Sequence, residues 1–153
     1  IEWLEMSKLD GLVSLSVPGR TLRTVFEHAV SNLIWSNKTD ITQSQACTPG
    51  NTILQVSGVR IVYDMSKTQG ERLQSVTVGG APLQDKRHYV VGTTEFLARG
   101  FSGFRWLRDT KRIGEHGSLR ESIERSVRDL HGTESNLPPT DGRMIFFGTE
   151  NRA

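Results

Sequence analysis

The chain has 153 residues, of which 35% are hydrophobic and 24% are charged, and its formal net charge is +2. This composition predicts one globular domain over residues 1–153 with a hydrophobic core. So small a positive excess excludes an argument for nucleic-acid binding from charge alone, and the sequence has no run of about 20 apolar residues that would span a bilayer.

Three features bear on the compartment. Residues 1–5 lack the basic and apolar regions of a signal peptide, which is compatible with a mature product from which such a peptide was removed. Cys47 is the single cysteine, so it is either a reduced, half-buried thiol or a thiol that pairs with another chain. Asn37 begins an Asn-Lys-Thr glycosylation sequon. We expect a secreted, extracellular protein.

The first predicted elements are a strand and a long helix. Residues 12–17 place hydrophobic side chains on one face and serines on the other, which predicts a strand with one wet face. Apolar residues at helical spacing then predict an amphipathic helix over 22–35, with Thr21 as its N-cap. Residues 36–51 are polar and are expected to form a loop.

The longest β-rich run is residues 54–64, which alternates on both sides of Gly58. Period-two alternation predicts a strand pair, and its interior glycine indicates a bulge or a close backbone approach. In the second strand Val59, Ile61 and Tyr63 share one face. We expect this strand to be central or near-central in its sheet.

The second half of the chain predicts further strands over residues 72–78, 88–92 and 143–147, with the middle one buried. Residues 96–98 predict one helical turn that Gly100 ends.

A second long helix is predicted after Ser118, which forms a capping box with Glu121. Its predicted core face consists of Leu119, Ile123, Val127 and Leu130. Helices interspersed with hairpin-type strands indicate an α+β fold with a mixed sheet and two long amphipathic helices.

The sequence shows no catalytic constellation and predicts no cofactor. The four histidines lack metal-ligand spacing to one another, to the cysteine or to a carboxylate pair, and are interpreted as structural: His28, His88, His116 and His131. A nucleophile elbow, a phosphate-binding glycine loop and a zinc-protease motif are all missing from the sequence.

One basic segment encloses an aromatic residue. It consists of Arg105, Trp106, Arg108, Lys111 and Arg112. The segment either contacts an anionic partner, such as a phosphate, a sulfated glycan or an acidic protein surface, or forms a solvated loop with its tryptophan in the core.

Residues 54–64, which read Leu-Gln-Val-Ser-Gly-Val-Arg-Ile-Val-Tyr-Asp, resemble the signature strand pair in the C-terminal domain of the 5′-nucleotidase/apyrase family. Four more segments resemble that domain in the same order, namely residues 17–30, 72–83, 89–98 and 142–146. The resemblance runs from about residue 11 to residue 147 and implies the fold of that domain.

The resemblance also implies how function is divided. In this family the two metals and the catalytic histidine lie on a separate N-terminal domain, of which this sequence contains nothing. The C-terminal domain recognises the substrate. Two aromatic rings hold the base, an acidic residue in a Gly-Gly-Asp-Gly turn holds the ribose, and an Asn-Gly-Gly-x-Arg segment meets the phosphate.

Carried over by position, the resemblance implies a degenerate nucleoside site at Phe96, Ser102 and Phe104. Phe96 stands where one stacking ring belongs, whereas Ser102 replaces the ribose-binding aspartate. Residues 6–8, where the second ring belongs, hold no aromatic side chain, and Trp3 replaces that ring only if the loop is shifted. The Asn-Gly-Gly-x-Arg segment is absent. Losing one ring and one carboxylate weakens nucleoside affinity by roughly two to four orders of magnitude.

Three functional hypotheses follow. The first is a non-catalytic secreted binding or effector protein, of the salivary type that acts on host haemostasis or immunity, with a protein or anionic surface as target and a second chain or homodimer as further partner. The alternative is the nucleotide-recognition part of a secreted 5′-nucleotidase or apyrase. A third is a glycan-binding module that uses the basic segment.

Overall fold

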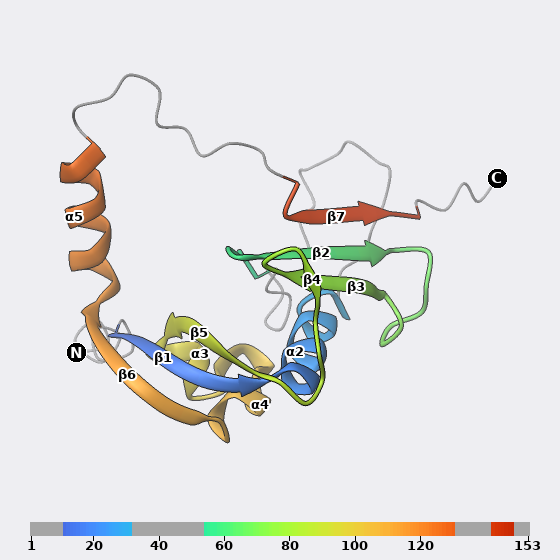
Figure 1. The fold of residues 1–153 in the computed structure, drawn as a ribbon, viewed down its shortest axis with the longest axis horizontal. Helices are drawn as coiled ribbons and strands as arrows, with labels where there is room; N and C mark the ends of the chain where they lie inside the picture. Colours follow the sequence, from blue (N-terminus) through green and yellow to red (C-terminus); the bar gives the residue numbers. More distant parts are fainter. Residues whose placement is uncertain (1–10, 32–53, 131–141, 149–153) are drawn as a thin grey trace. The chain divides into compact units, whose positions relative to one another are not determined.

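The computed structural model describes residues 11–31, 54–130 and 142–148, which divide between two compact units (Figure 1). Of the described residues, 11–18 and 88–130 belong to the first unit, and 19–31, 54–87 and 142–148 belong to the second. The assignment of residues 1–153 to one domain stays a prediction. Several predicted features lie outside the described residues: Cys47, Asn37, residues 6–8, the C-terminal part of the first helix and His131.

The first unit is built on a three-stranded antiparallel sheet in the order β5-β1-β6 (Figure 1). The central strand is β1 (Gly11–Pro18), between β5 (His88–Thr94) and β6 (Lys111–Ser118). The predicted alternation in β1 is confirmed, because Val13 and Leu15 are at most 3% exposed while the serine at position 14 is half-buried.

Strand β6 was not predicted. Its sequence, Lys-Arg-Ile-Gly-Glu-His-Gly-Ser, has no hydrophobic alternation, and its side chains are mostly exposed. The register of β1 with β6 shifts twice, between Gly11 and Val13 and between Ser14 and Leu15. Backbone pairing with β1, rather than side-chain burial, therefore defines this edge strand.

Strand β5 is present where the sequence predicts it, but the prediction that it is buried is wrong. Val90 is 74% exposed, and β5 lies at the other edge of the sheet. A short apolar run therefore marks a strand without saying which of its faces is covered.

Three short helices follow β5, namely α3 (Glu95–Ala98), η3 (Phe101–Gly103) and α4 (Arg105–Arg108). The predicted helical turn and its end at Gly100 are confirmed, since Gly100 has φ of +85°. A Cβ at Gly100 would come within 3.0 Å of the Arg105 Cα, so the chain turns tightly here.

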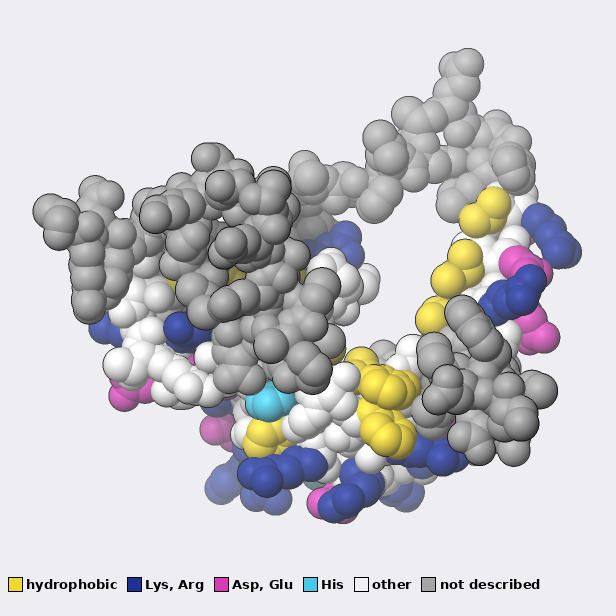
Figure 2. Space-filling view, turned by 180° about the vertical axis from the view of Figure 1, so that it is seen from behind, with side chains coloured by type: hydrophobic (Ala, Val, Ile, Leu, Met, Phe, Trp, Pro, Cys, Tyr) yellow, Lys and Arg dark blue, Asp and Glu magenta, His cyan; other side chains and the backbone are white. Residues whose placement is uncertain are grey.

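Helix α5 (Leu119–Leu130) begins as predicted, with the Glu121 backbone N–H donating to the Ser118 hydroxyl at 3.1 Å. The predicted burial of its apolar face is wrong for the described residues, because Ile123 is 54% exposed and Val127 is 48% exposed. Figure 2 shows hydrophobic side chains along one side of this helix and charged ones along the other. Among the helices of the described part of the chain, none combines the length and the hydropathy that a membrane span requires.

The second unit contains a four-stranded mixed sheet in the order β4-β3-β2-β7 (Figure 1). Its strands are β2 (Val59–Asp64), β3 (Leu73–Val78), β4 (Ala81–Pro82) and β7 (Met144–Phe147). The inner position of β2 is confirmed, antiparallel to β3 and parallel to β7. The predicted strand before Gly58 is wrong, because residues 54–56 pair with no strand.

Helix α2 (Gly19–Ser31) begins earlier than predicted. The Gly19 N–H donates to the Arg87 carbonyl at 2.8 Å and the Arg20 N–H donates to the Asp85 carbonyl at 3.1 Å. These two contacts satisfy donors of the first turn, so the predicted N-cap at Thr21 is wrong.

The core of the second unit forms around Tyr63, which is fully buried. Its hydroxyl donates to the Phe26 carbonyl at 3.1 Å, and its ring stacks on Phe146 with centroids 5.2 Å apart. Burial, helped by the nearby charge of Glu27, raises the pKa of the Tyr63 hydroxyl. The tyrosine therefore joins helix and sheet through one buried, neutral side chain.

Glu27 makes a second link between α2 and the sheet. Its carboxylate accepts backbone N–H groups from Gly70 at 3.1 Å, Arg72 at 3.1 Å and Leu73 at 2.6 Å. Arg72 in turn donates to the Val30 carbonyl at 2.6 Å. The turn before β3 is therefore held against the helix by polar contacts from both sides.

Candidate functional site

The site expected from the resemblance begins where β5 passes into α3. The Thr94 hydroxyl caps this helix by accepting the Leu97 N–H at 3.3 Å. Adjacent positions of the helix then point in different directions, since Glu95 is 7% exposed and Phe96 is 36% exposed. One turn of helix thus presents an aromatic ring to solvent and directs a carboxylate inward.

The exposed ring of Phe96 already has a partner within the chain. The ring of Phe101 stacks on it, with centroids 4.8 Å apart and planes inclined by 17°. Phe101 is itself 45% exposed, so the two rings form an aromatic pair at the surface of the first unit. Sequence reasoning missed Phe101. The signal was a phenylalanine at the second position of the Gly-Phe-Ser-Gly turn, where the resemblance has glycine.

Ser102 keeps the backbone conformation of a tight turn. It has φ of +53°, and it is the one residue other than glycine with positive φ in the described part of the chain. Gly100 and Gly103 on either side have φ of +85° and +82°. The turn therefore presents a short hydroxyl side chain at the position where the resemblance places a carboxylate.

Phe104 lies in the core of the first unit. It is fully buried, and its backbone N–H donates to the Phe101 carbonyl at 3.1 Å. Leu107, three residues further on, is 4% exposed. The structure thus places Phe104 beneath the turn as a support, and not at the surface beside Phe96; a role of Phe104 in binding stays a prediction.

The basic segment is divided between two elements. Arg105, Trp106 and Arg108 lie on α4, whereas Lys111 and Arg112 lie on β6. The Arg105 guanidinium lies 5.1 Å from the centroid of the Trp106 ring, which is half-buried. Arg108 lies 3.6 Å from the Asp109 carboxylate, and both side chains are well exposed. The segment is a short helix followed by a strand rather than a loop.

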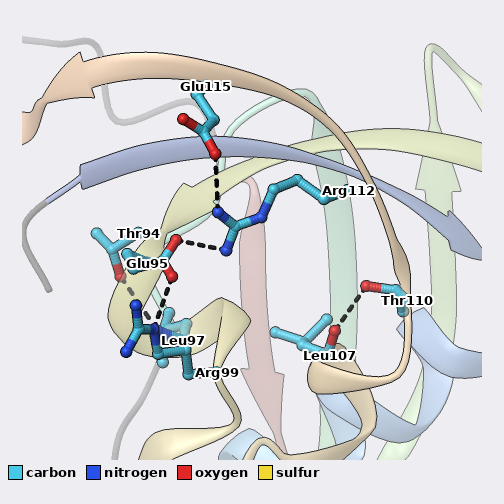
Figure 3. A network of polar contacts seen from close by, with 8 residues as sticks. All are labelled: Thr94, Glu95, Leu97, Arg99, Leu107, Thr110, Arg112 and Glu115. Carbon is cyan, nitrogen blue, oxygen red and sulfur yellow. Dashed lines mark hydrogen bonds and ion pairs between the residues drawn. The ribbon is translucent and has the colours of Figure 1, made fainter.

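Arg112 belongs to a network that joins α3 to β6 (Figure 3). Glu95 accepts from Arg112 and from Arg99, each at 2.6 Å, and Arg112 also donates to Glu115 at 3.1 Å. Hydrogen bonds from Arg112, and then Arg99, hold the pKa of the Glu95 carboxyl below its usual value, against an opposing effect of burial. Bonds to Glu95 and Glu115 raise the pKa of Arg112. This arginine is therefore balanced by two carboxylates.

The structure brings one serine and one histidine together. The Ser14 hydroxyl lies 2.6 Å from Nε2 of His116, across strands β1 and β6. Activation of a serine needs a third group that orients the histidine, and none of the described carboxylates bonds to His116. The described residues also contain no group of three or more His, Cys, Asp or Glu side chains that could hold a metal ion.

Comparison with known proteins extends these observations. The family described as 5′-nucleotidase, C-terminal domain matches residues 6–109. A snake venom 5′-nucleotidase from Naja atra is 31% identical over 140 residues, which are 86% of this chain and 24% of that protein. An apyrase from Tabanus yao is 33% identical over 109 residues, which are 65% of this chain and 18% of that protein. The chain thus spans about a quarter or less of these two relatives.

Solved structures show the same fold. The 5′-nucleotidase precursor of Thermus thermophilus matches 93% of this chain with a TM-score of 0.69 and 26% identity, over 26% of its own length. A Staphylococcus aureus protein described as a putative 5′-nucleotidase matches 90% of this chain with a TM-score of 0.68 and 14% identity, over 27% of its own length.

Proposed function

The chain belongs to the 5′-nucleotidase C-terminal domain family, and we propose that it acts by binding rather than by catalysis, as a secreted binding or effector protein. The observation that carries this proposal is the stacking of Phe101 on Phe96, with ring centroids 4.8 Å apart. By the resemblance, Phe96 is the ring on which a nucleoside base would lie. The chain's own phenylalanine covers one face of that ring.

The serine at the neighbouring turn also weakens nucleoside binding. Ser102 stands where the resemblance places a ribose-binding aspartate, and a neutral hydroxyl makes a weaker hydrogen bond to a ribose hydroxyl than a carboxylate does. A base would have to use the opposite face of Phe96 without this anchor. The inherited nucleoside site is therefore weakened both at the base and at the sugar.

The proposal assigns no hydrolytic step to these residues. By the resemblance, the metals and the catalytic histidine belong to an N-terminal domain. The one serine–histidine contact, between Ser14 and His116, lacks an orienting carboxylate among the described residues.

The proposed setting is extracellular. It is supported by the snake venom 5′-nucleotidases among the relatives, from Naja atra and Macrovipera lebetinus. We propose a protein or an anionic surface as the target, with action on host haemostasis or immunity as the specific case, and a second chain or homodimer as a further partner.

A second candidate function is nucleotide recognition on behalf of a larger 5′-nucleotidase or apyrase. It is supported by the share of its relatives that the chain spans, 24% for the Naja atra protein and 18% for the Tabanus yao apyrase. It is also supported by the remaining exposure of Phe96, which is 36%.

Calorimetric titration with adenosine and AMP separates these two functions. The variant Phe96→Ala tests the inherited site, and Phe147→Ala, which removes another exposed phenylalanine from the second unit, is the matched control. If the chain is a binding or effector protein with a weakened nucleoside site, the unmodified chain should bind adenosine and AMP with dissociation constants weaker than about 1 mM. Micromolar binding that is lost in Phe96→Ala and kept in Phe147→Ala would instead establish nucleotide recognition.

A further inference from the structure

The second unit contains a basic pocket whose lining shares no residue with the aromatic pair, the turn or the basic segment of the first unit. Its volume is about 280 Å³. It is lined by two arginines, three glycines, a valine and a threonine: Arg60, Arg143, Gly58, Gly79, Gly80, Val59 and Thr77. None of these side chains carries a negative charge.

The wall of the pocket comes from the β2–β3–β4 hairpins. Arg60 on β2 is opposite Thr77 on β3. The chain then turns through Gly79 and Gly80, which have φ of +58° and +81°, and pairs again at once. Two successive positive φ values are typical of a two-residue hairpin turn in which only glycine is unstrained. A Cβ at either glycine would meet no atom within 4 Å, so this side of the pocket is open.

Arg143 is held in place at the start of β7. Its Nη1 donates to the Val56 carbonyl at 3.0 Å, and its own carbonyl accepts the Ile61 N–H at 2.8 Å. Arg60 is exposed, and it forms no ion pair with a carboxylate in the part of the chain that the structure describes. One arginine is thus positioned by the backbone, and the other faces the same pocket without a described counter-charge.

Comparison with Arg112 indicates that the pocket favours an anionic ligand. Arg112 is balanced by Glu95 and Glu115, so its charge is already compensated. In the pocket, none of the described lining residues is a carboxylate, and the exposed Arg60 forms no described ion pair, so its charge favours the entry of an anion. Guanidinium groups bind phosphate and sulfate oxygens through paired, charge-assisted hydrogen bonds.

We infer that this pocket, lined by Arg60 and Arg143 at the Gly79-Gly80 turn, binds a tetrahedral oxyanion, which is a phosphate or sulfate group carried by a small molecule or a sugar unit. Its volume of about 280 Å³ lies just below the range typical of ligand pockets, which is about 300–1,000 Å³, and suits one such group with a small carrier. The inference of an anion site uses neither Phe96 nor the proposal that the chain binds without catalysing a reaction. It can therefore fail or succeed independently of the proposed function.

The test is an NMR titration of the full chain, which follows the backbone amides of Gly58, Gly79 and Gly80. The probes are inorganic phosphate, inorganic sulfate, glucose 6-phosphate and glucose 6-sulfate, each compared with sodium chloride at equal ionic strength to remove general screening. We expect saturable shifts of the three glycine amides in the millimolar range or tighter. The tighter of the two glucose esters identifies the source as a phosphate monoester or a sulfated glycan.

Variants locate the site. Arg60→Ala is expected to weaken binding at least tenfold, and Arg143→Lys to weaken it while retaining a donor for the Val56 carbonyl. Arg125→Ala, an exposed arginine on α5 of the first unit, is the matched control and should leave binding unchanged. Absence of saturable shifts at the glycines, unchanged binding in folded Arg60→Ala, or equal weakening in Arg125→Ala would each overturn the inference.

Discussion

Phe101 stacks on Phe96 with ring centroids 4.8 Å apart, so the aromatic ring expected to receive a ligand is paired within its own chain. An aromatic pair of this kind contributes about 0.5–1.5 kcal/mol beyond the area that it buries. A ligand that needs the covered face of Phe96 must first displace Phe101. The cost is comparable to the gain from one base–ring stack, which is about 1–3 kcal/mol.

Replacement of Phe101 by glycine is expected to strengthen adenosine binding. Phe101→Gly uncovers the second face of Phe96, and a gain of about 1.4 kcal/mol corresponds to a tenfold lower dissociation constant. Calorimetry measures this change, with Phe147→Ala as the control for loss of an exposed ring. Adding Ser102→Asp should increase affinity further, since it supplies a carboxylate at the turn. Unchanged affinity in both variants would contradict the idea that Phe101 blocks this site.

The stability of the first unit is expected to fall in acid because of Glu95. Its pKa is lowered in the folded chain from an ordinary value of 4.5, chiefly by Arg112 and Arg99. The unfolded chain therefore binds the proton more readily, and the contribution of this carboxylate is present above pH 4.5 and is lost as the pH falls through the lower, folded pKa. Urea unfolding between pH 7 and pH 3 measures this loss.

The matched variants for this network are Glu95→Gln and Glu115→Gln. Removing the buried carboxylate leaves Arg99 and Arg112 without their shared partner, and we expect a loss of about 1–3 kcal/mol near neutral pH and a flatter acid dependence. The Glu115 side chain is 75% exposed, so Glu115→Gln should cost no more than about 1 kcal/mol. Equal effects of the two variants would contradict the central role of Glu95.

Replacement of Glu27 by glutamine is expected to destabilise the second unit. The carboxylate accepts three backbone N–H groups, from Gly70, Arg72 and Leu73, whereas an amide has a single oxygen to offer. The expected cost is about 1–3 kcal/mol in the free energy of unfolding. Glu124→Gln, on the exposed face of α5, is the control and should change stability by less than about 0.5 kcal/mol. A cost as small as that of the control would show that solvent replaces the bonds of Glu27.

The start of α2 can be tested with two substitutions. Gly19→Ala should destabilise the chain although alanine is the better helix former, because a Cβ at Gly19 would collide with the Gln84 carbonyl. Thr21→Ala should be nearly neutral, since Thr21 lies inside the helix, whereas loss of an N-cap costs about 1 kcal/mol. Thermal unfolding measures both. The reverse order of effects would restore Thr21 as the cap.

The sequence alone determined the strands in which buried and exposed side chains alternate. Strands β1 and β2 were predictable because successive side chains point to opposite faces, so that a buried face must appear as every second residue. The cap of α5 was predictable for the same local reason, since Ser118 and Glu121 are three residues apart. The family was also recognisable from ordered segments of the chain, and the domain match over residues 6–109 agrees with them.

Tertiary structure alone decided how these elements pair and what remains uncovered. Strand β6 has no hydrophobic pattern and exists because its backbone pairs with β1, while the parallel pairing of β2 with β7 joins segments about eighty residues apart. The helical spacing of Ile123 and Val127 defines an apolar face, but periodicity cannot say whether another element covers it. Likewise, the stacking of Phe101 on Phe96 and the placement of Arg60 and Arg143 in the lining of one pocket depend on distances through space, which residue types and spacing do not contain.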